Sequence, residues 1–114
     1  AGRITVSAEI FEKAVAGKLS YCAAKHAMVG LMRSVAQDTL GSGVHAALVA
    51  PGITDTPMVR AASTGKEEAF ESFVRDLQGR MLQPDEVARF IWDVAQSPIL
   101  NGAVLHCNGG QKER

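Results

Sequence analysis

The sequence predicts an α/β fold built on a parallel sheet, because three strand-like runs alternate with amphipathic helical stretches. The run 44–50 is almost wholly apolar, which is typical of a strand buried on both faces of a parallel sheet. Runs 3–8 and 103–107 are shorter and rich in β-branched or apolar residues. We therefore expect a βαβ-type unit with right-handed crossovers, which is half of a doubly wound sheet.

Three stretches have the spacing of amphipathic helices. The first runs from Ser20, a residue type that caps helices, to about Leu40 and stops at a glycine-rich turn. The second has its apolar positions within 69–77, and Pro84 marks the first turn of the third. No internal repeat, low-complexity segment or linker divides the chain, so we expect a single domain.

The composition argues against several classes of partner. Hydrophobic residues make up 46% of the chain, and 12 basic residues balance 12 acidic ones, so neither a nucleic-acid nor a membrane partner is expected. The sequence has no stretch of eighteen apolar residues and its start lacks the regions of a signal peptide. These observations predict a cytoplasmic protein.

The cysteines and histidines do not have the spacing of a metal site. Cys22 and Cys107 are the two cysteines and lack CxxC spacing, which favours reduced thiols over a disulfide or zinc. The three histidines are scattered and have no nearby carboxylate cluster. We therefore expect no metal.

Tyr21 and Lys25 are the pair with the most chemical meaning. A spacing of four places a phenol and an ammonium on one face of a helix. A neighbouring cation favours the phenolate and lowers a tyrosine pKa from its ordinary value near 10, so that the phenol can exchange protons near neutral pH. The spacing alone also fits a half-buried tyrosine beside a solvated lysine, so the interpretation depends on the rest of the chain.

Three motifs in order supply that context. YCAAK at 21–25 opens a long helix rich in small residues, PGITDT at 51–56 ends the buried strand, and LNGAVLHCNGG at 100–110 closes the chain. Together they resemble the C-terminal half of the short-chain dehydrogenase/reductases. That family carries a glycine-rich phosphate-binding turn in an N-terminal half, and no such turn follows the first strand here. We therefore expect residues 1–114 to be the C-terminal part of one Rossmann-type domain. In that case any targeting signal would have been lost with the N-terminal half.

The resemblance implies an oxidoreductase that interconverts a carbonyl and a secondary alcohol by hydride transfer with NAD or NADP. Tyr21 would be the catalytic acid/base, and Lys25 would lower its pKa and hydrogen-bond the nicotinamide ribose. Gly52 would let backbone approach the nicotinamide closely, and the main chain near Thr54 would bind its carboxamide. The cofactor-binding residues implied in this way are Tyr21, Lys25, Pro51, Gly52, Thr54 and Thr56.

The third catalytic residue implied by the resemblance is a serine, and here the chain departs from the family. The family places it thirteen residues before the tyrosine, which is Ala8 in this sequence, and Ser7 lies one position further. A shift of one residue turns a side chain to the other face of a strand. Ser7 therefore fills the role only if a bulge or a local slip re-aims it.

The stretch 64–78 corresponds to the family's mobile flap over the substrate. Phe70, Phe73 and Leu77 could line an apolar pocket for a small hydrophobic carbonyl compound or alcohol, or could belong to the core. The sequence leaves these two possibilities open.

The resemblance also implies a homo-oligomer, a dimer or a tetramer, because the family uses the long helix and the last helix and strand at its subunit interfaces. We expect these residues alone to be inactive. The alternative function is a catalytically inactive relative, or a truncated protein, that acts as an oligomerisation or interaction module. A complete small binding domain is a third possibility.

Overall fold

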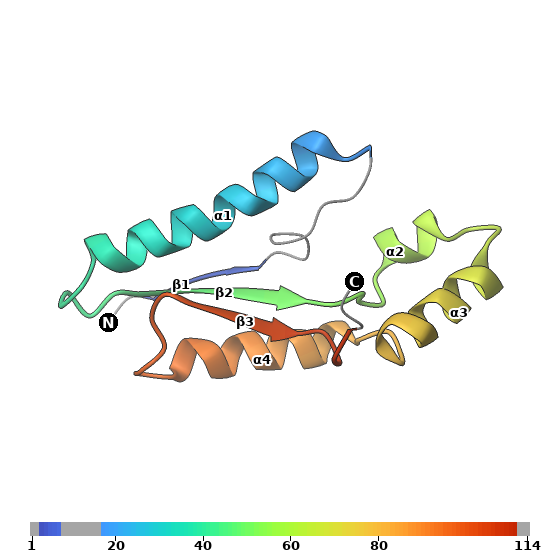
Figure 1. Ribbon diagram of the computed structural model, residues 1–114. Helices are drawn as coiled ribbons and strands as arrows, with labels where there is room; N and C mark the ends of the chain where they lie inside the picture. Colours follow the sequence, from blue (N-terminus) through green and yellow to red (C-terminus); the bar gives the residue numbers. More distant parts are fainter. Residues whose placement is uncertain (1–2, 8–16, 112–114) are drawn as a thin grey trace.

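The computed structural model describes residues 3–7 and 17–111 of the chain. For residues 3–7 this description covers the backbone only. Strands and helices alternate along it, as the sequence predicts (Figure 1). Their order is β1 (Arg3–Ser7), α1 (Leu19–Asp38), β2 (His45–Pro51), α2 (Pro57–Ala62), α3 (Glu67–Gln78), α4 (Pro84–Gln96) and β3 (Ala103–Cys107).

The strands of the described part form one parallel sheet in the order β1-β2-β3. In this register Ser7 pairs with Val49, and Pro51 pairs with Cys107. The carboxyl ends of all three strands therefore meet at one edge of the sheet, which we call the carboxyl edge (Figure 1).

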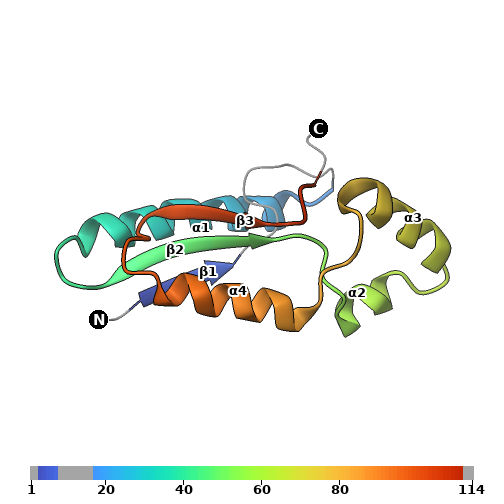
Figure 2. The same ribbon diagram turned by 90° about the horizontal axis from the view of Figure 1, so that it is seen from below.

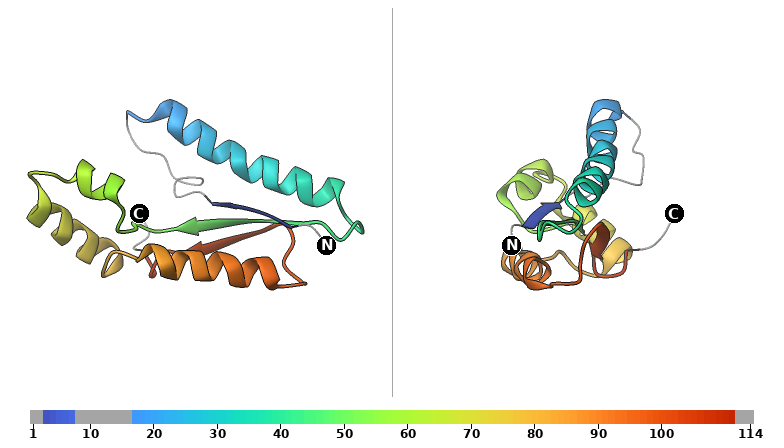
Figure 3. Two further views of the ribbon diagram at one scale, coloured as in Figure 1. Left: turned by 180° about the vertical axis from the view of Figure 1, so that it is seen from behind. Right: turned by 90° about the vertical axis from the view of Figure 1, so that its left-hand side faces the viewer.

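The central strand β2 is buried on both faces, as its apolar run predicts. Successive side chains of a strand point to opposite faces, so β2 serves two cores at once. Ala46, Leu48 and Ala50 pack against Met32 and Ala36 of α1. On the other face, Ala47 and Val49 pack against Val94 of α4. The result is three layers, with the sheet between α1 and α4 (Figures 1 and 3).

The two crossovers differ in hand, which corrects one prediction. The strands advance in one direction across the sheet, yet α1 and α4 lie on opposite faces. The connection from β1 to β2 is therefore right-handed, and the connection from β2 to β3 is left-handed (Figure 3). The rule that predicts a right-handed crossover applies where a strand feeds the returning helix directly. Here α2 and α3 intervene between β2 and α4, so the chain has the length to reach the other face.

The helix ends show a second correction and one omission. Ser20 is not the cap of α1, because the helix begins at Leu19 and the Lys18 carbonyl already accepts from Cys22 N at 2.8 Å. The short helix α2 was not predicted. Its signal was present, because Thr56 caps it through a 3.2 Å bond from Val59 N and Pro57 occupies its first position.

None of the described helices is both long and apolar enough to cross a membrane.

We expect Leu48→Ala to destabilise the fold by about 2 to 5 kcal/mol, because Leu48 is fully buried in the centre of the sheet and its truncation leaves a cavity. Leu40→Ala is the matched control, since Leu40 is 64% exposed and its loss should change the free energy of unfolding by no more than about 0.5 kcal/mol. Urea unfolding of both variants measures the difference. Equal effects of the two substitutions would contradict the burial of Leu48 between the sheet and α1.

Candidate functional site

The carboxyl edge gathers most of the residues that the sequence singles out. The loop that follows β2 leaves the sheet here, at the centre of the edge, and carries Gly52, Thr54 and Thr56. Helix α1 runs antiparallel to the strands, so its first turn, with Tyr21, lies at the same end of the molecule (Figure 1). In open α/β sheets, ligands bind outside the carboxyl ends of the strands.

Tyr21 and Lys25 lie on one face of α1, as their spacing predicts. The Lys25 Nζ is 5.5 Å from the centroid of the Tyr21 ring, which is within the range of a cation–π contact. Tyr21 is 41% exposed, so it lies at the surface of the described residues. The pair therefore places a positive charge beside the ring of a partly exposed tyrosine.

Ser7 is the last residue of β1, and its side chain lies outside the described residues. The pairing of β1 with β2 is one-to-one from Arg3 to Ser7, so this strand contains no bulge. A catalytic role for Ser7 stays a prediction.

Gly52 is buried because two segments approach its backbone closely. A Cβ at this position would lie 2.7 Å from Gln78 Oε1 and 3.0 Å from the Cα of Asn108. The second of these neighbours is backbone, which cannot move as a side chain does. Only glycine fits between α3 and the segment after β3.

Thr54 presents backbone groups that nothing in the described residues binds. It forms a parallel bridge with Leu82, in which Leu82 N donates to Ile53 O at 2.9 Å and Asp55 N donates to Leu82 O at 2.7 Å. In such a bridge the flanking residues make the bonds, so the N–H and C=O of the bridging residue face the other side. Among the described residues, no hydrogen bond engages the Thr54 N–H or C=O.

The hydroxyls and charges of this loop stabilise its shape. Thr54 Oγ1 donates to Gly52 O at 3.0 Å, and Thr56 Oγ1 accepts the capping bond that begins α2. Arg60 binds Asp55 through two bonds, at 2.7 and 2.9 Å. The Arg60 hydrogen bonds lower the pKa of the Asp55 carboxyl. Thr56 therefore acts as a helix cap, and no described residue accepts its hydroxyl proton.

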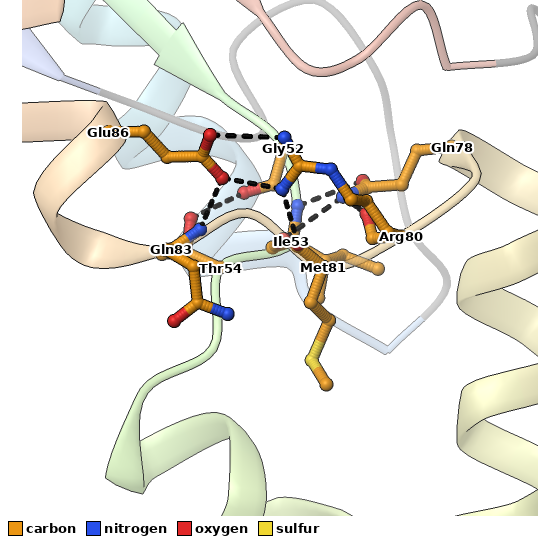
Figure 4. A network of polar contacts seen from close by, with 8 residues as sticks. All are labelled: Gly52, Ile53, Thr54, Gln78, Arg80, Met81, Gln83 and Glu86. Atoms are coloured by element: carbon orange, nitrogen blue, oxygen red, sulfur yellow. Dashed lines mark hydrogen bonds and ion pairs between the residues drawn. The ribbon is translucent and has the colours of Figure 1, made fainter.

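Gln78 is a central residue of the site that the sequence interpretation missed. It is the last residue of α3, is 7% exposed, and its side chain binds both backbone groups of Ile53 (Figure 4). A signal was present, because Gln78 continues the helical stripe of Phe70 and Val74 at the next four-residue step. A polar residue at a buried position of such a stripe indicates a hydrogen-bonded role.

Arg80 and Glu86 fasten the segment between α3 and α4 (Figure 4). Two guanidinium nitrogens bind the two carboxylate oxygens at 2.5 and 3.0 Å, and Glu86 Oε1 also accepts from Gln83 N at 2.8 Å. These bonds lower the pKa of Glu86 from 4.5 to about 2, and the hydrogen bond from Arg80 has the largest effect.

Helices α2 and α3 extend beyond the carboxyl edge, where the flap is expected (Figure 2). Phe73 is 45% exposed, so it does not belong to the core of the described residues. Phe70 and Leu77 are half-buried, and Val74 is the buried apolar residue of α3. A substrate pocket lined by these aromatic residues stays a prediction.

Within residues 17–111, no cluster of three or more histidine, cysteine or acidic side chains is placed to hold a metal ion. Cys22 and Cys107 are free thiols, and partial burial raises the pKa of Cys107.

A family model described as enoyl-(acyl carrier protein) reductase matches residues 1–112 of this chain. Among curated proteins, 3-oxoacyl-[acyl-carrier-protein] reductase FabG of Vibrio harveyi is 34% identical over 113 residues, which cover 96% of this chain and 46% of the relative. The 3-hydroxyacyl-CoA dehydrogenase type-2 of Drosophila melanogaster is 31% identical over 105 residues, which cover 92% of this chain and 40% of the relative. The chain thus spans less than half the length of these relatives.

Solved structures share the fold. The crystal structure of 3-hydroxyacyl-CoA dehydrogenase type-2 from Mycobacterium avium superposes with a TM-score of 0.83 at 28% identity, over 99% of this chain and 44% of that one. An actinorhodin polyketide ketoreductase with NADPH gives a TM-score of 0.84 at 28% identity, over 96% of this chain and 46% of that one. These likenesses confirm the predicted α/β fold class, the C-terminal half of a Rossmann-type sheet.

The ion pair of Arg80 and Glu86 predicts a specific dependence of stability on pH. Because the pKa of Glu86 is lowered from 4.5 to about 2, the pair's contribution is fully present above pH 4.5 and is lost as the pH falls through about 2. Glu86→Gln should therefore lower the melting temperature at pH 7, and the gap from the unsubstituted protein should close toward pH 2.

Asp93→Asn, at an exposed position of the same helix, serves as the control. Thermal melts from pH 7 to pH 2 at constant ionic strength give the comparison. A gap for Glu86→Gln that stays constant over this range would contradict the pairing.

Proposed function

Because this chain belongs to the short-chain dehydrogenase/reductase family, we propose that it is part of an NAD(P)-dependent oxidoreductase that interconverts a carbonyl compound and a secondary alcohol. One observation carries the proposal. The Tyr21–Lys25 pair and the loop with Thr54, whose backbone groups no described residue engages, lie at the same end of a parallel sheet. A proton donor and a carboxamide-binding segment are the parts that such a reaction requires on this side of the sheet.

We propose that these residues work together with an N-terminal half that binds the rest of the dinucleotide. The lengths support this, because the chain covers 46% of the Vibrio harveyi relative and 40% of the Drosophila melanogaster relative. The described strand β1 also has one edge without a partner strand in the described part, since the sheet order places β2 on its other side. On this proposal the 114 residues alone are inactive.

Tyr21 acts as the acid/base. In the reductive direction its hydroxyl gives a proton to the carbonyl oxygen, and in the oxidative direction its phenolate takes the proton from the alcohol. The ammonium of Lys25, at the ring of Tyr21, stabilises the negative charge that the phenolate carries. The three N–H donors of Lys25 leave it able to bind a ribose hydroxyl as well.

The loop after β2 fits the nicotinamide carboxamide. A primary carboxamide carries both a donor and an acceptor, and Thr54 has an N–H and a C=O that no described residue engages. Gly52 allows the loop to pass close to its neighbours, and the hydroxyl of Thr56 can still donate one hydrogen bond. When bound, the cofactor supplies or accepts the hydride.

The proposed substrate is a small ketone or secondary alcohol with an apolar body. Phe73 is 45% exposed and belongs to α3. Helices α2 and α3 extend beyond the carboxyl edge (Figure 2). Two relatives named for hydroxyacyl and oxoacyl compounds support a carbonyl on an acyl chain.

Tyr21→Phe in the full-length protein should lower turnover by about 10²-fold to 10⁴-fold, because phenylalanine keeps the ring but cannot transfer a proton. The melting temperature and the Kd for cofactor should change little, since only the hydroxyl is lost. Ser20→Ala is the control, because it removes the neighbouring hydroxyl in the same helical turn. Steady-state kinetics beside calorimetry decide the matter, and turnover within a few-fold of the unsubstituted protein would remove Tyr21 from the chemistry.

A further inference from the structure

The side-chain amide of Gln78 uses its full hydrogen-bonding capacity inside the site. An amide has two N–H donors and an oxygen with two lone pairs. Nε2 donates to Ile53 O at 3.0 Å and to Arg80 O at 2.8 Å. Oε1 accepts from Ile53 N at 3.0 Å and from Gln111 Nε2 at 2.9 Å. Two of these four bonds hold the same residue, Ile53, by its N–H and its C=O (Figure 4).

Anchoring α3 does not by itself call for an amide at this position. An apolar side chain at the end of the Phe70–Val74 stripe would bury as well, whereas a buried amide is costly unless every polar atom is bonded. What the amide adds is a fixed orientation of the Ile53 backbone.

That orientation passes directly to Thr54. The peptide unit between Ile53 and Thr54 is planar and trans, so the Thr54 N–H points opposite to the Ile53 C=O. Gln78 Nε2 and Leu82 N both bind the Ile53 C=O. The Thr54 N–H must therefore point away from Gln78 and Leu82. In the same way, the bond from Asp55 N to Leu82 O turns the Thr54 C=O away from Leu82.

We propose that Gln78 is a positioning residue for the cofactor, which orients the Thr54 N–H and C=O toward the nicotinamide carboxamide by holding both backbone groups of Ile53. The proposal rests on the proposed function and adds to it a residue outside the sequence motifs. Gln78 does not touch the cofactor in this account, because its own bonds are all used within the protein.

The segment after β3 takes part in the same arrangement. Asn108 Oδ1 accepts from Gly110 N at 3.0 Å and from Gln111 N at 3.3 Å, which turns the chain so that Gln111 reaches Gln78. A continuous series of hydrogen bonds thus connects Asn108, Gln111, Gln78 and the loop after β2. The segment around Asn108, at the end of the last glycine-rich motif, therefore stabilises the loop after β2 through Gln78.

The test uses the full-length protein with NAD⁺ and NADP⁺ in turn, and two readouts. Gln78→Leu should raise the Kd of the preferred cofactor about tenfold, because the two bonds that orient Ile53 are lost. In the cofactor-free protein, the Ile53 amide should lose its protection from hydrogen exchange. Gln96→Leu, at an exposed position at the end of α4, is the control and should change neither quantity.

Gln78→Glu separates orientation from simple packing. At pH 8 the introduced carboxylate keeps an acceptor for Ile53 N but offers no donor to the Ile53 and Arg80 carbonyls, so the Kd should rise as it does in Gln78→Leu. Burial near carbonyl oxygens raises the pKa of a carboxyl, so acid pH protonates it and restores one donor. The Kd of this variant should therefore approach that of the unsubstituted protein near pH 5.5.

The outcomes are distinguishable. An unsubstituted protein that binds neither NAD⁺ nor NADP⁺ overturns the proposed function and this inference with it. If the unsubstituted protein binds and Gln78→Leu binds equally well with a lower melting temperature, Gln78 is structural only and the inference alone fails. Tighter binding by Gln78→Leu also overturns it, because the cofactor would then compete with Gln78 for Ile53. A Gln78→Glu variant whose affinity does not recover at acid pH overturns the role of the donor.

Discussion

The burial of β2 on both faces is the constraint on which the rest of the structure depends. Five consecutive residues, 46–50, are buried, and their side chains alternate between α1 and α4. The backbone of β2 can satisfy its polar groups only through parallel neighbours, which β1 and β3 provide. A strand that is covered on both faces and paired on both sides is open only at its two ends. The loop after Pro51 leaves at one of them, and its geometry is consequently fixed by a rigid element.

The left-handed return to β3 shapes the site as much as the strand does. Because the chain crosses to the opposite face only after α2 and α3, these helices lie beyond the carboxyl edge instead of beside the sheet (Figure 2). The segment between α3 and α4 then passes back beneath the loop, and Leu82 bridges Thr54 there. The exposed Arg80–Glu86 ion pair stabilises this segment, and the buried Gln78 side chain donates to the Arg80 carbonyl within it. The segment from α2 to the start of α4 thus supplies the proposed flap and the residues that support the loop after β2.

Strong periodic patterns were readable from the sequence, and contacts between distant residues were not. The apolar run of β2 and Pro84 at the start of α4 predicted their elements within one residue, because local chemistry determines them. The predicted hand of the second crossover was wrong, because the hand depends on how long the chain is between β2 and α4. Gln78 was missed because its partners lie 25 and 33 residues away, and only folding brings them together. The motif residues Tyr21 and Gly52 could be identified from the family resemblance. The structure adds the reason for the glycine, because the backbone of Gly52 lies too close to Gln78 and Asn108 for a side chain.

The central claim is that the charge of Lys25 makes Tyr21 an acid/base near neutral pH, and it can be measured without turnover. Tyr21 is the one tyrosine of these 114 residues. When the full-length protein is labelled with ¹³C at the tyrosine Cζ, the resonance that is missing from Tyr21→Phe belongs to Tyr21. The account predicts a Tyr21 titration midpoint below the ordinary value of about 10, and a higher midpoint in Lys25→Met. The same midpoint in both proteins would contradict it.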